Sequence, residues 1–178
     1  TLDGNSATIS QTDSATASAS IDQNGDSSTA DVSQTNATQG STVEVIQSGQ
    51  IHAVYVNQVD AEKSTAMVSQ TGDAVNYARI NQNDFQNTAT ITQKNGSANT
   101  ASSLQSGDYG IVNVLQTGDE NESTNDQKGF ALSALTEQSG YRTTASIFQG
   151  GAVNKAQISQ LFADETGQDN EAEVNQDG

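Results

Sequence analysis

The 178-residue chain contains no cysteine, no proline and no tryptophan. The absence of cysteine excludes disulfide bonds and thiolate metal sites. Proline removes a backbone donor from a hydrogen-bonded ladder, so its absence permits a chain in which almost every strand lies between two others. Only 32% of the residues are hydrophobic and 4% are aromatic. That is too little apolar material for a deep globular core, so we expect a thin one.

Basic residues are also scarce. The chain has 6 Lys and Arg against 22 Asp and Glu, for a net charge of −16. This balance disfavours binding to nucleic acid and adhesion to an anionic membrane by charge alone. No apolar run reaches the roughly 18 residues of a membrane-spanning helix, so we expect no membrane insertion. No secretion signal is evident at Thr1, and we expect a mature chain whose targeting segment has been removed.

A recurring glutamine is the most prominent feature that the chain does contain. Successive members of the series are 11 to 13 residues apart, except for the final pair, which is 16 apart. A short period over the whole length predicts a stacked array of units, in which each unit buries its inward side chains only by contact with its neighbours. The series consists of Gln11, Gln23, Gln34, Gln47, Gln58, Gln70, Gln82, Gln93, Gln105, Gln116, Gln127, Gln138, Gln149, Gln160 and Gln176.

The residues before each glutamine alternate with period two. Ile or Val stands two places before it in twelve of the fifteen units, Ala stands four places before it in eleven, and Asn six places before it in seven. The unit N-x-A-x-[IV]-x-Q therefore predicts a strand whose inward face carries these residues. Gly, Asp or Asn follows two places after the glutamine in nearly every unit, as at Asp13 and Gly25, which predicts a tight bend there.

Each unit is therefore one short strand and one bend. Two units make one flattened coil, and we expect an all-β fold: a β-solenoid of about seven coils with two short strands per coil, stacked at the cross-β spacing of about 4.8 Å. The whole chain, 1–178, forms a single repeat domain. An irregular insertion near 161–169 lengthens the last unit, and we expect it to protrude as a loop.

Stacking places glutamine above glutamine, where each amide can donate to and accept from its neighbours. A buried amide without partners costs about 1–3 kcal/mol, so the fifteen glutamines are predicted to form hydrogen-bonded ladders. A second ladder on the other edge is predicted for Asn5, Asn76, Asn87, Asn99, Asn154 and Asn170. The alternative is a disordered repetitive chain with exposed amides, and the strict phasing with Ala and Ile or Val argues against it.

The units resemble the repeats of curlins, the secreted subunits of bacterial curli fibres, usually written S-x5-Q-x-G-x-G-N-x-A-x3-Q. Residues 82–93, 70–82 and 149–160 carry the Q, N, A and Q positions, the second with one extra residue in its bend. The second glycine of the motif is mostly missing. The resemblance implies a subunit that passes unfolded through a dedicated outer-membrane pore, with chaperone and nucleator partners. It further implies extracellular amyloid fibres on the cell surface, for adhesion and biofilm matrix.

Polymerisation also follows from the pattern itself. Each end of a solenoid is an unpaired strand edge, and here no proline or obvious cap blunts either one. The first unit, Asn5 to Gln11, and the last, Asn170 to Gln176, present the same inward residues. A head-to-tail contact that does not close produces a filament, so the expected partner is the chain itself.

Other chemistry is poorly represented. The single histidine, His52, has no second His or Cys to form a metal site or a catalytic triad, so we expect no enzyme activity, cofactor or metal centre. Asp60, Asp73, Asp84 and Asp119 lie in bends and leave weak calcium binding open. Outward Thr pairs such as Thr88 and Thr90 leave an ice-binding or other surface-binding solenoid as the alternative function, and a thermal-hysteresis measurement on the monomer would separate the two.

Overall fold

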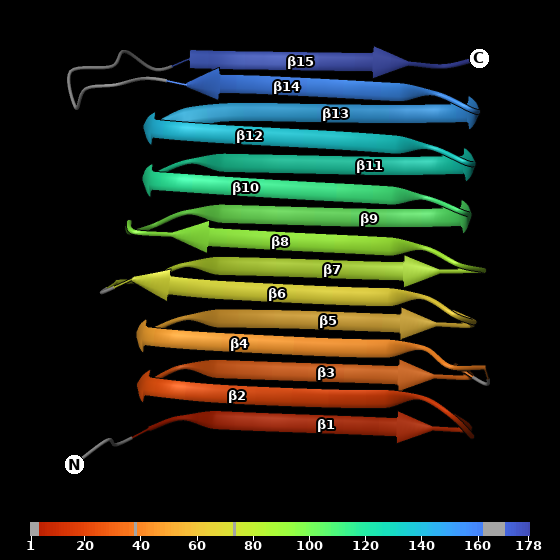
Figure 1. Ribbon diagram of the computed structural model, residues 1–178, viewed down its shortest axis with the longest axis horizontal. Helices are drawn as coiled ribbons and strands as arrows, with labels where there is room; N and C mark the ends of the chain where they lie inside the picture. The colour runs from red at the N-terminus through yellow and green to blue at the C-terminus, as the bar shows by residue number, and fades with distance from the viewer. Residues whose placement is uncertain (1–3, 38, 73, 162–169) are drawn as a thin grey trace.

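The computed structural model describes residues 4–37, 39–72, 74–161 and 170–178 (Figure 1). Within these ranges the chain forms fifteen strands and no helix. The strands are β1 (Ser6–Thr12), β2 (Ser18–Asp26), β3 (Thr29–Thr35), β4 (Thr42–Gln50), β5 (Ala53–Val59), β6 (Thr65–Gly72), β7 (Tyr77–Asn83), β8 (Thr88–Lys94), β9 (Thr100–Asp108), β10 (Ile111–Asp119), β11 (Glu122–Phe130), β12 (Ser133–Tyr141), β13 (Thr143–Ala152), β14 (Lys155–Leu161) and β15 (Asn170–Gln176).

The strands form two parallel sheets. The odd-numbered strands make an eight-stranded sheet in the order β1-β3-β5-β7-β9-β11-β13-β15, and the even-numbered strands make a seven-stranded sheet from β2 to β14. Consecutive strands run in opposite directions and belong to opposite sheets, so one strand of each sheet completes a coil (Figure 1). The expectation of an all-β solenoid with about seven coils and two strands per coil is confirmed.

The register between coils follows the glutamines. Gln11 pairs with Gln34, and Gln34 with Gln58. The same pairing continues to Gln176 in the odd-numbered sheet and to Gln160 in the even-numbered sheet. Because side chains alternate between the faces of a strand, this register also stacks the inward aliphatic residues of most coils on one another, as Ala66 on Ala89 and Val68 on Ile91. The interior of β7 is typical: Ala78, Ile80 and Gln82 are all completely buried.

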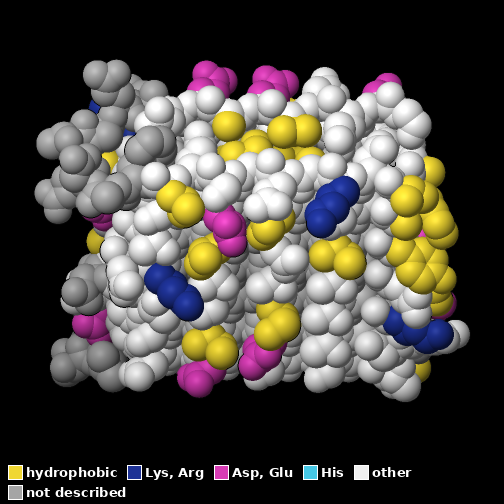
Figure 2. All heavy atoms as spheres, turned by 45° about the horizontal axis from the view of Figure 1, so that its top comes forward, with side chains coloured by type: hydrophobic (Ala, Val, Ile, Leu, Met, Phe, Trp, Pro, Cys, Tyr) yellow, Lys and Arg dark blue, Asp and Glu magenta, His cyan; other side chains and the backbone are white. Residues whose placement is uncertain are grey.

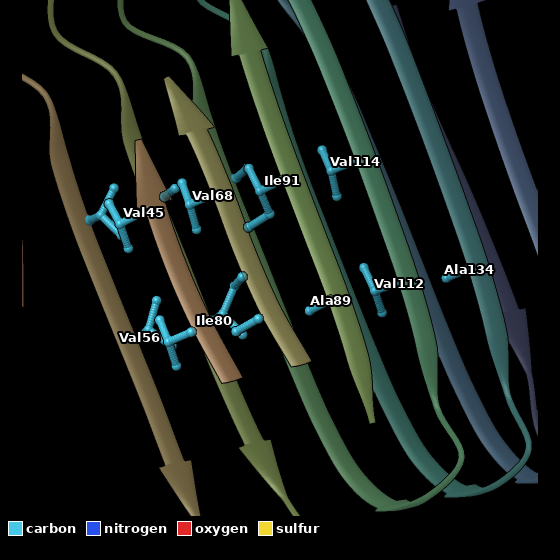
Figure 3. Close-up of a cluster of buried hydrophobic side chains, with 14 of the residues drawn as sticks. Val45, Val56, Val68, Ile80, Ala89, Ile91, Val112, Val114 and Ala134 are labelled. Atoms are coloured by element: carbon cyan, nitrogen blue, oxygen red, sulfur yellow. The ribbon is translucent and has the colours of Figure 1, made fainter. Parts of the chain in front are cut away.

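The core between the sheets is a thin layer of small and branched aliphatic side chains. Figure 3 shows Val45, Val68, Ile91 and Val114 along one sheet, with Val56 and Ile80 facing them from the other. Burial fades at both ends of the stack, since every residue of β1 is exposed and the inward residues of β15 are only half-buried. The end strands therefore carry the same inward residues as the middle without the same cover.

The bends use left-handed backbone. Where Asp or Asn stands two places after the glutamine, it takes this conformation as predicted, with φ of 51° at Asp13 and 54° at Asn36. Where glycine stands there, the prediction is two residues early: β10 continues through Gly118, and the left-handed residue is Glu120, with φ of 54°. Glycine also has a steric task that the sequence did not reveal. A Cβ added to Gly129 would lie 1.9 Å from the carbonyl oxygen of Gly151 in the next coil, and one on Gly107 would lie 2.1 Å from that of Gly129. The close approach of successive coils at this corner therefore requires glycine.

Two expectations fall on residues outside the described ranges. These are the protruding loop, of which only Leu161 is described, as the last residue of β14, and the bend residue Asp73.

Candidate functional site: the amide ladders and the ends of the stack

All fifteen glutamines of the repeat lie in two ladders of side-chain hydrogen bonds. In the odd-numbered sheet, seven Nε2–H···Oε1 bonds of 2.7 to 3.2 Å join Gln11, Gln34, Gln58, Gln82, Gln105, Gln127, Gln149 and Gln176. In the even-numbered sheet, six bonds of 2.7 to 3.2 Å join Gln23, Gln47, Gln70, Gln93, Gln116, Gln138 and Gln160. Most of these amides are almost wholly buried, from Gln34 at 0% exposed to Gln160 at 8%.

The same amides also tie the two sheets together. Gln93 donates to the carbonyl oxygen of Tyr77 at 3.0 Å, and Gln116 donates to that of Thr100 at 2.9 Å. In each case the acceptor is the first residue of the preceding strand, which belongs to the opposite sheet. A primary amide has two N–H donors and one carbonyl acceptor, so this arrangement engages all three groups. This explains how so many polar side chains can be buried without the cost of unsatisfied groups.

Both ladders have one direction. Every bond runs from the Nε2 of the coil nearer the N-terminus to the Oε1 of the coil nearer the C-terminus. The first amides, Gln11 and Gln23, therefore direct an Oε1 acceptor towards the outside of the stack, and the last, Gln160 and Gln176, direct an Nε2 donor. The two ends of the molecule are complementary to one another and not to themselves.

The asparagines differ from the expected amide-to-amide pairing. Asn99 accepts from the backbone N–H of Asn121 through Oδ1 at 3.0 Å and donates from Nδ2 to the carbonyl of Gly118 at 2.6 Å. Asn76 and Asn87 bond in the same way to the backbone of the next coil. The asparagine side chain is one methylene shorter and lies at the corner before its strand, where the backbone of the next coil is within reach.

The other predicted asparagines lie at or near the ends. Asn5, in the first coil, accepts from the backbone N–H of Ser28 at 2.9 Å and donates to the carbonyl of Gly25 at 2.7 Å. Asn154 donates to the carbonyl of Gly150 at 2.6 Å. Asn170 begins β15, and its carbonyl accepts from Nε2 of Gln160 at 3.3 Å.

Serine occupies the asparagine position in several units, and sequence reasoning missed its role. The hydroxyl of Ser41 accepts from the backbone N–H of Ser64 at 3.3 Å, and that of Ser64 accepts from the N–H of Asn87 at 3.1 Å. A side-chain oxygen at this position reaches the backbone of the next coil, and the signal in the sequence was Asn or Ser six residues before ten of the fifteen glutamines. His52 fills the same position, buried, with Nε2 3.2 Å from the carbonyl of Ser48.

The units that end at Gln127 and Gln138 replace core aliphatics with polar residues. Thr136 donates to Oδ1 of Asn125 at 3.2 Å across the two sheets, and Asn125 donates to the hydroxyl of Ser123 at 3.1 Å. This network satisfies three polar side chains inside the stack. Ser103, one coil below Asn125, is also fully buried, but its hydroxyl has no hydrogen-bond partner.

Aromatic side chains form a column on one edge of the stack. The ring centroids of Phe85 and Tyr109 are 5.6 Å apart, those of Tyr109 and Phe130 are 5.3 Å apart, and Nζ of Lys63 lies 5.2 Å from the centre of Phe85. Figure 2 shows hydrophobic side chains gathered along such an edge, while acidic groups are scattered over the rest of the visible face. These contacts join residues about one coil apart and stiffen that edge.

The described residues offer little other chemistry. Among them, no group of three or more His, Asp or Glu side chains is placed to hold a metal ion. The described part of the chain also has no helix that is long and apolar enough to cross a membrane. No family model, curated protein or solved structure matches the sequence or the fold. The ladders and the two ends of the stack are therefore the features from which a function can be argued.

Proposed function

We propose that the chain is the structural subunit of an extracellular fibre of the curli type, which grows by head-to-tail addition of chains. The observation that carries this proposal is the common direction of the two glutamine ladders. The acceptor end at Gln11 and Gln23 matches the donor end at Gln160 and Gln176, whereas two like ends would set acceptor against acceptor or donor against donor. One chain can thus continue both ladders of another.

The backbone at the first coil supports the same contact. The N–H of Ser6 donates to the carbonyl of Ser28, and the N–H of Ser18 donates to that of Ser41. In a parallel ladder alternate residues bond to the same neighbour, so the N–H groups of Ile9 and Ile21 point away from the molecule. Ile9 is 46% exposed although its position is an inward one. Both features are typical of an unpaired edge strand, which can form hydrogen bonds with a further strand.

The remaining parts of the proposal rest on the resemblance to curlins. Export in an unfolded state, an outer-membrane pore, chaperone and nucleator partners, and a role in adhesion and biofilm matrix are proposed on that ground. The net charge of −16 supports this scheme, because mutual repulsion slows association before export. The proposed fibre needs neither a cofactor nor catalysis.

The experiment is to incubate the purified soluble chain with a cross-β dye, follow the fluorescence, and image the product by electron microscopy. The variant Ile9→Pro/Ile21→Pro removes two outward N–H donors without removing a donor within the chain, and we expect it to abolish elongation. The matched control Ile9→Ala/Ile21→Ala loses side-chain volume but keeps the N–H groups, so it should still elongate, at a reduced rate. Fibres of the proline variant that grow at the rate of the unmodified chain would contradict end-to-end stacking.

A further inference from the structure

The stack of described residues has an odd number of strands. It begins with β1 and ends with β15, and both belong to the eight-stranded sheet, so β2 and β14 are the outer strands of the other sheet. Each strand is related to the next by half a turn about the stack axis and half a rung of rise, because consecutive strands run in opposite directions in opposite sheets (Figure 1). Fifteen such steps end half a turn away from the start.

We infer that successive chains in the fibre are rotated by half a turn about the fibre axis, so that β1 of one chain pairs with β14 of the chain before it and β2 pairs with β15. This inference rests on the proposed function, because it specifies the geometry of the head-to-tail contact. The partner is a second copy of this chain, and the surfaces are the outer edges of the four terminal strands.

The unrotated contact leaves a gap. If β1 of the next chain paired with β15, then β2 of that chain would lie two rungs above β14, about 9.6 Å away instead of about 4.8 Å. One strand would be missing from the seven-stranded sheet at every contact. The backbone donors and acceptors of the two facing edges would have no strand partner, and the ladder would break between Gln160 and Gln23.

The rotated contact leaves no gap and keeps like residues in register. Along β14 and the incoming β1 the inward pairs are Ala156 with Ala7, Ile158 with Ile9, and Gln160 with Gln11. Along β15 and the incoming β2 they are Ala172 with Ala19, Val174 with Ile21, and Gln176 with Gln23. Both amide ladders therefore pass through the contact without interruption. On the outer face, acidic Glu171 and Glu173 meet the hydroxyls of Ser18 and Ser20, so no like charges oppose one another.

The glycine columns at the corners are compatible with the rotated contact. The corner after the odd-numbered strands carries Asp13, Asn36, Asp60 and Asp84 in its first coils and Gly107, Gly129, Gly151 and Gly178 in its last. The corner after the even-numbered strands begins with Gly25 and Gly49, which approach so closely that a Cβ on Gly25 has no room. Rotation by half a turn places Gly178 beneath Gly25 and so continues one glycine column into the other. Without rotation, Gly178 would lie beneath Asp13.

Introduced cysteines can distinguish the two contacts, since the chain has none of its own. Residues in register on adjacent strands are about 4.8 Å apart at Cα, within the range of a disulfide. Ser10→Cys/Ser159→Cys places one thiol on β1 and one on β14, and Ser10→Cys/Asn175→Cys places the second on β15. All three side chains point outward. Ser10→Cys/Ser33→Cys, in register within one chain, controls for the oxidation chemistry.

Fibres of the 178-residue chain are grown under reducing conditions, checked by electron microscopy, oxidised, and run on a non-reducing gel. We expect Ser10→Cys/Ser159→Cys to give a ladder of covalent multimers and Ser10→Cys/Asn175→Cys to remain monomeric. The reverse result would overturn the half-turn while leaving end-to-end growth intact. Fibres in which neither pair forms multimers, while the Ser10/Ser33 control closes, would overturn both proposals.

Discussion

Gln93 offers a direct test of what a buried amide contributes to the stack. It is fully buried, accepts from Nε2 of Gln70 at 2.7 Å, donates to Oε1 of Gln116 at 2.8 Å, and donates to the carbonyl of Tyr77 at 3.0 Å. Gln93→Leu keeps a similar side-chain volume and removes all three hydrogen bonds. The substitution therefore separates the hydrogen bonding of the ladder from its packing.

The expected loss follows from the groups left behind. The facing Nε2–H of Gln70 and the Oε1 of Gln116 become unsatisfied at about 1–3 kcal/mol each. Burial of the leucine side chain returns about 1–2 kcal/mol. At the midpoints of these ranges, about 4 kcal/mol is lost and about 1.5 kcal/mol returned, so we expect the free energy of unfolding to fall by about 2–3 kcal/mol. It is measured by urea denaturation of the dilute soluble chain, followed by far-UV circular dichroism. An unchanged dependence on urea concentration would show that the same structure unfolds.

The control is Gln157→Leu, since Gln157 is exposed and points outward from β14. Its effect should stay within about 0.5 kcal/mol, as for most surface substitutions. If Gln93→Leu cost less than about 1 kcal/mol, the ladder would add no net stability, and the fold would depend on backbone pairing and aliphatic packing alone.

Three further substitutions test other features of the stack by the same denaturation assay. Ser103→Ala removes a buried hydroxyl that has no partner, so it should raise the free energy of unfolding by about 1 kcal/mol, and a loss of stability would show that the hydroxyl is satisfied after all. Val153→Gly relieves a β-branched residue at φ of 58°, which should stabilise the chain by about 0.5–1 kcal/mol; a destabilised variant would argue against strain there. Gly129→Ala puts a Cβ 1.9 Å from the carbonyl oxygen of Gly151 and should lower the free energy of unfolding by more than about 3 kcal/mol. The control Gly40→Ala, with φ of 65° and no atom within 4 Å of the added Cβ, should lower it by about 1 kcal/mol. Equal losses of stability in the two variants would refute the steric argument.

If successive chains are rotated by half a turn, each side of the fibre shows the outer face of the odd-numbered sheet in one chain and that of the even-numbered sheet in the next. The aromatic column of Phe85, Tyr109 and Phe130 follows the corner after the odd-numbered strands, so a half-turn at each contact moves it from one edge of the fibre to the other. Lateral contacts through this column would then recur on both edges with a period of two chains. Alternation of this kind distributes apolar surface evenly and limits any continuous hydrophobic stripe.

The alternative of an ice-binding surface stays a prediction. Thr42, Thr65 and Thr88 are stacked in register on the outer face of the even-numbered sheet. The row continues with Ile111, and Met67 interrupts the neighbouring row at β6. A measurement of thermal hysteresis on the soluble chain remains the appropriate test.

The sequence by itself determined the strands, their inward faces and the number of coils. Period-two alternation fixes which side chains share a face, and the spacing of the glutamines fixes the register, because a shift of one residue would turn every aliphatic side chain outward. Local patterns are sufficient for these features, since each unit repeats the same choice. The positions of Ala78, Ile80 and Gln82 in the core could therefore be predicted before any contact was known.

Only the tertiary structure decided which atoms meet between coils. Whether the oxygen of Asn99 meets another amide or the backbone N–H of Asn121 depends on the height and angle of the next corner. The need for glycine at Gly129 depends on a carbonyl 22 residues further along the chain. These partners are neighbours in space but not in sequence, and their distances are set by the closing of each coil onto the one below it.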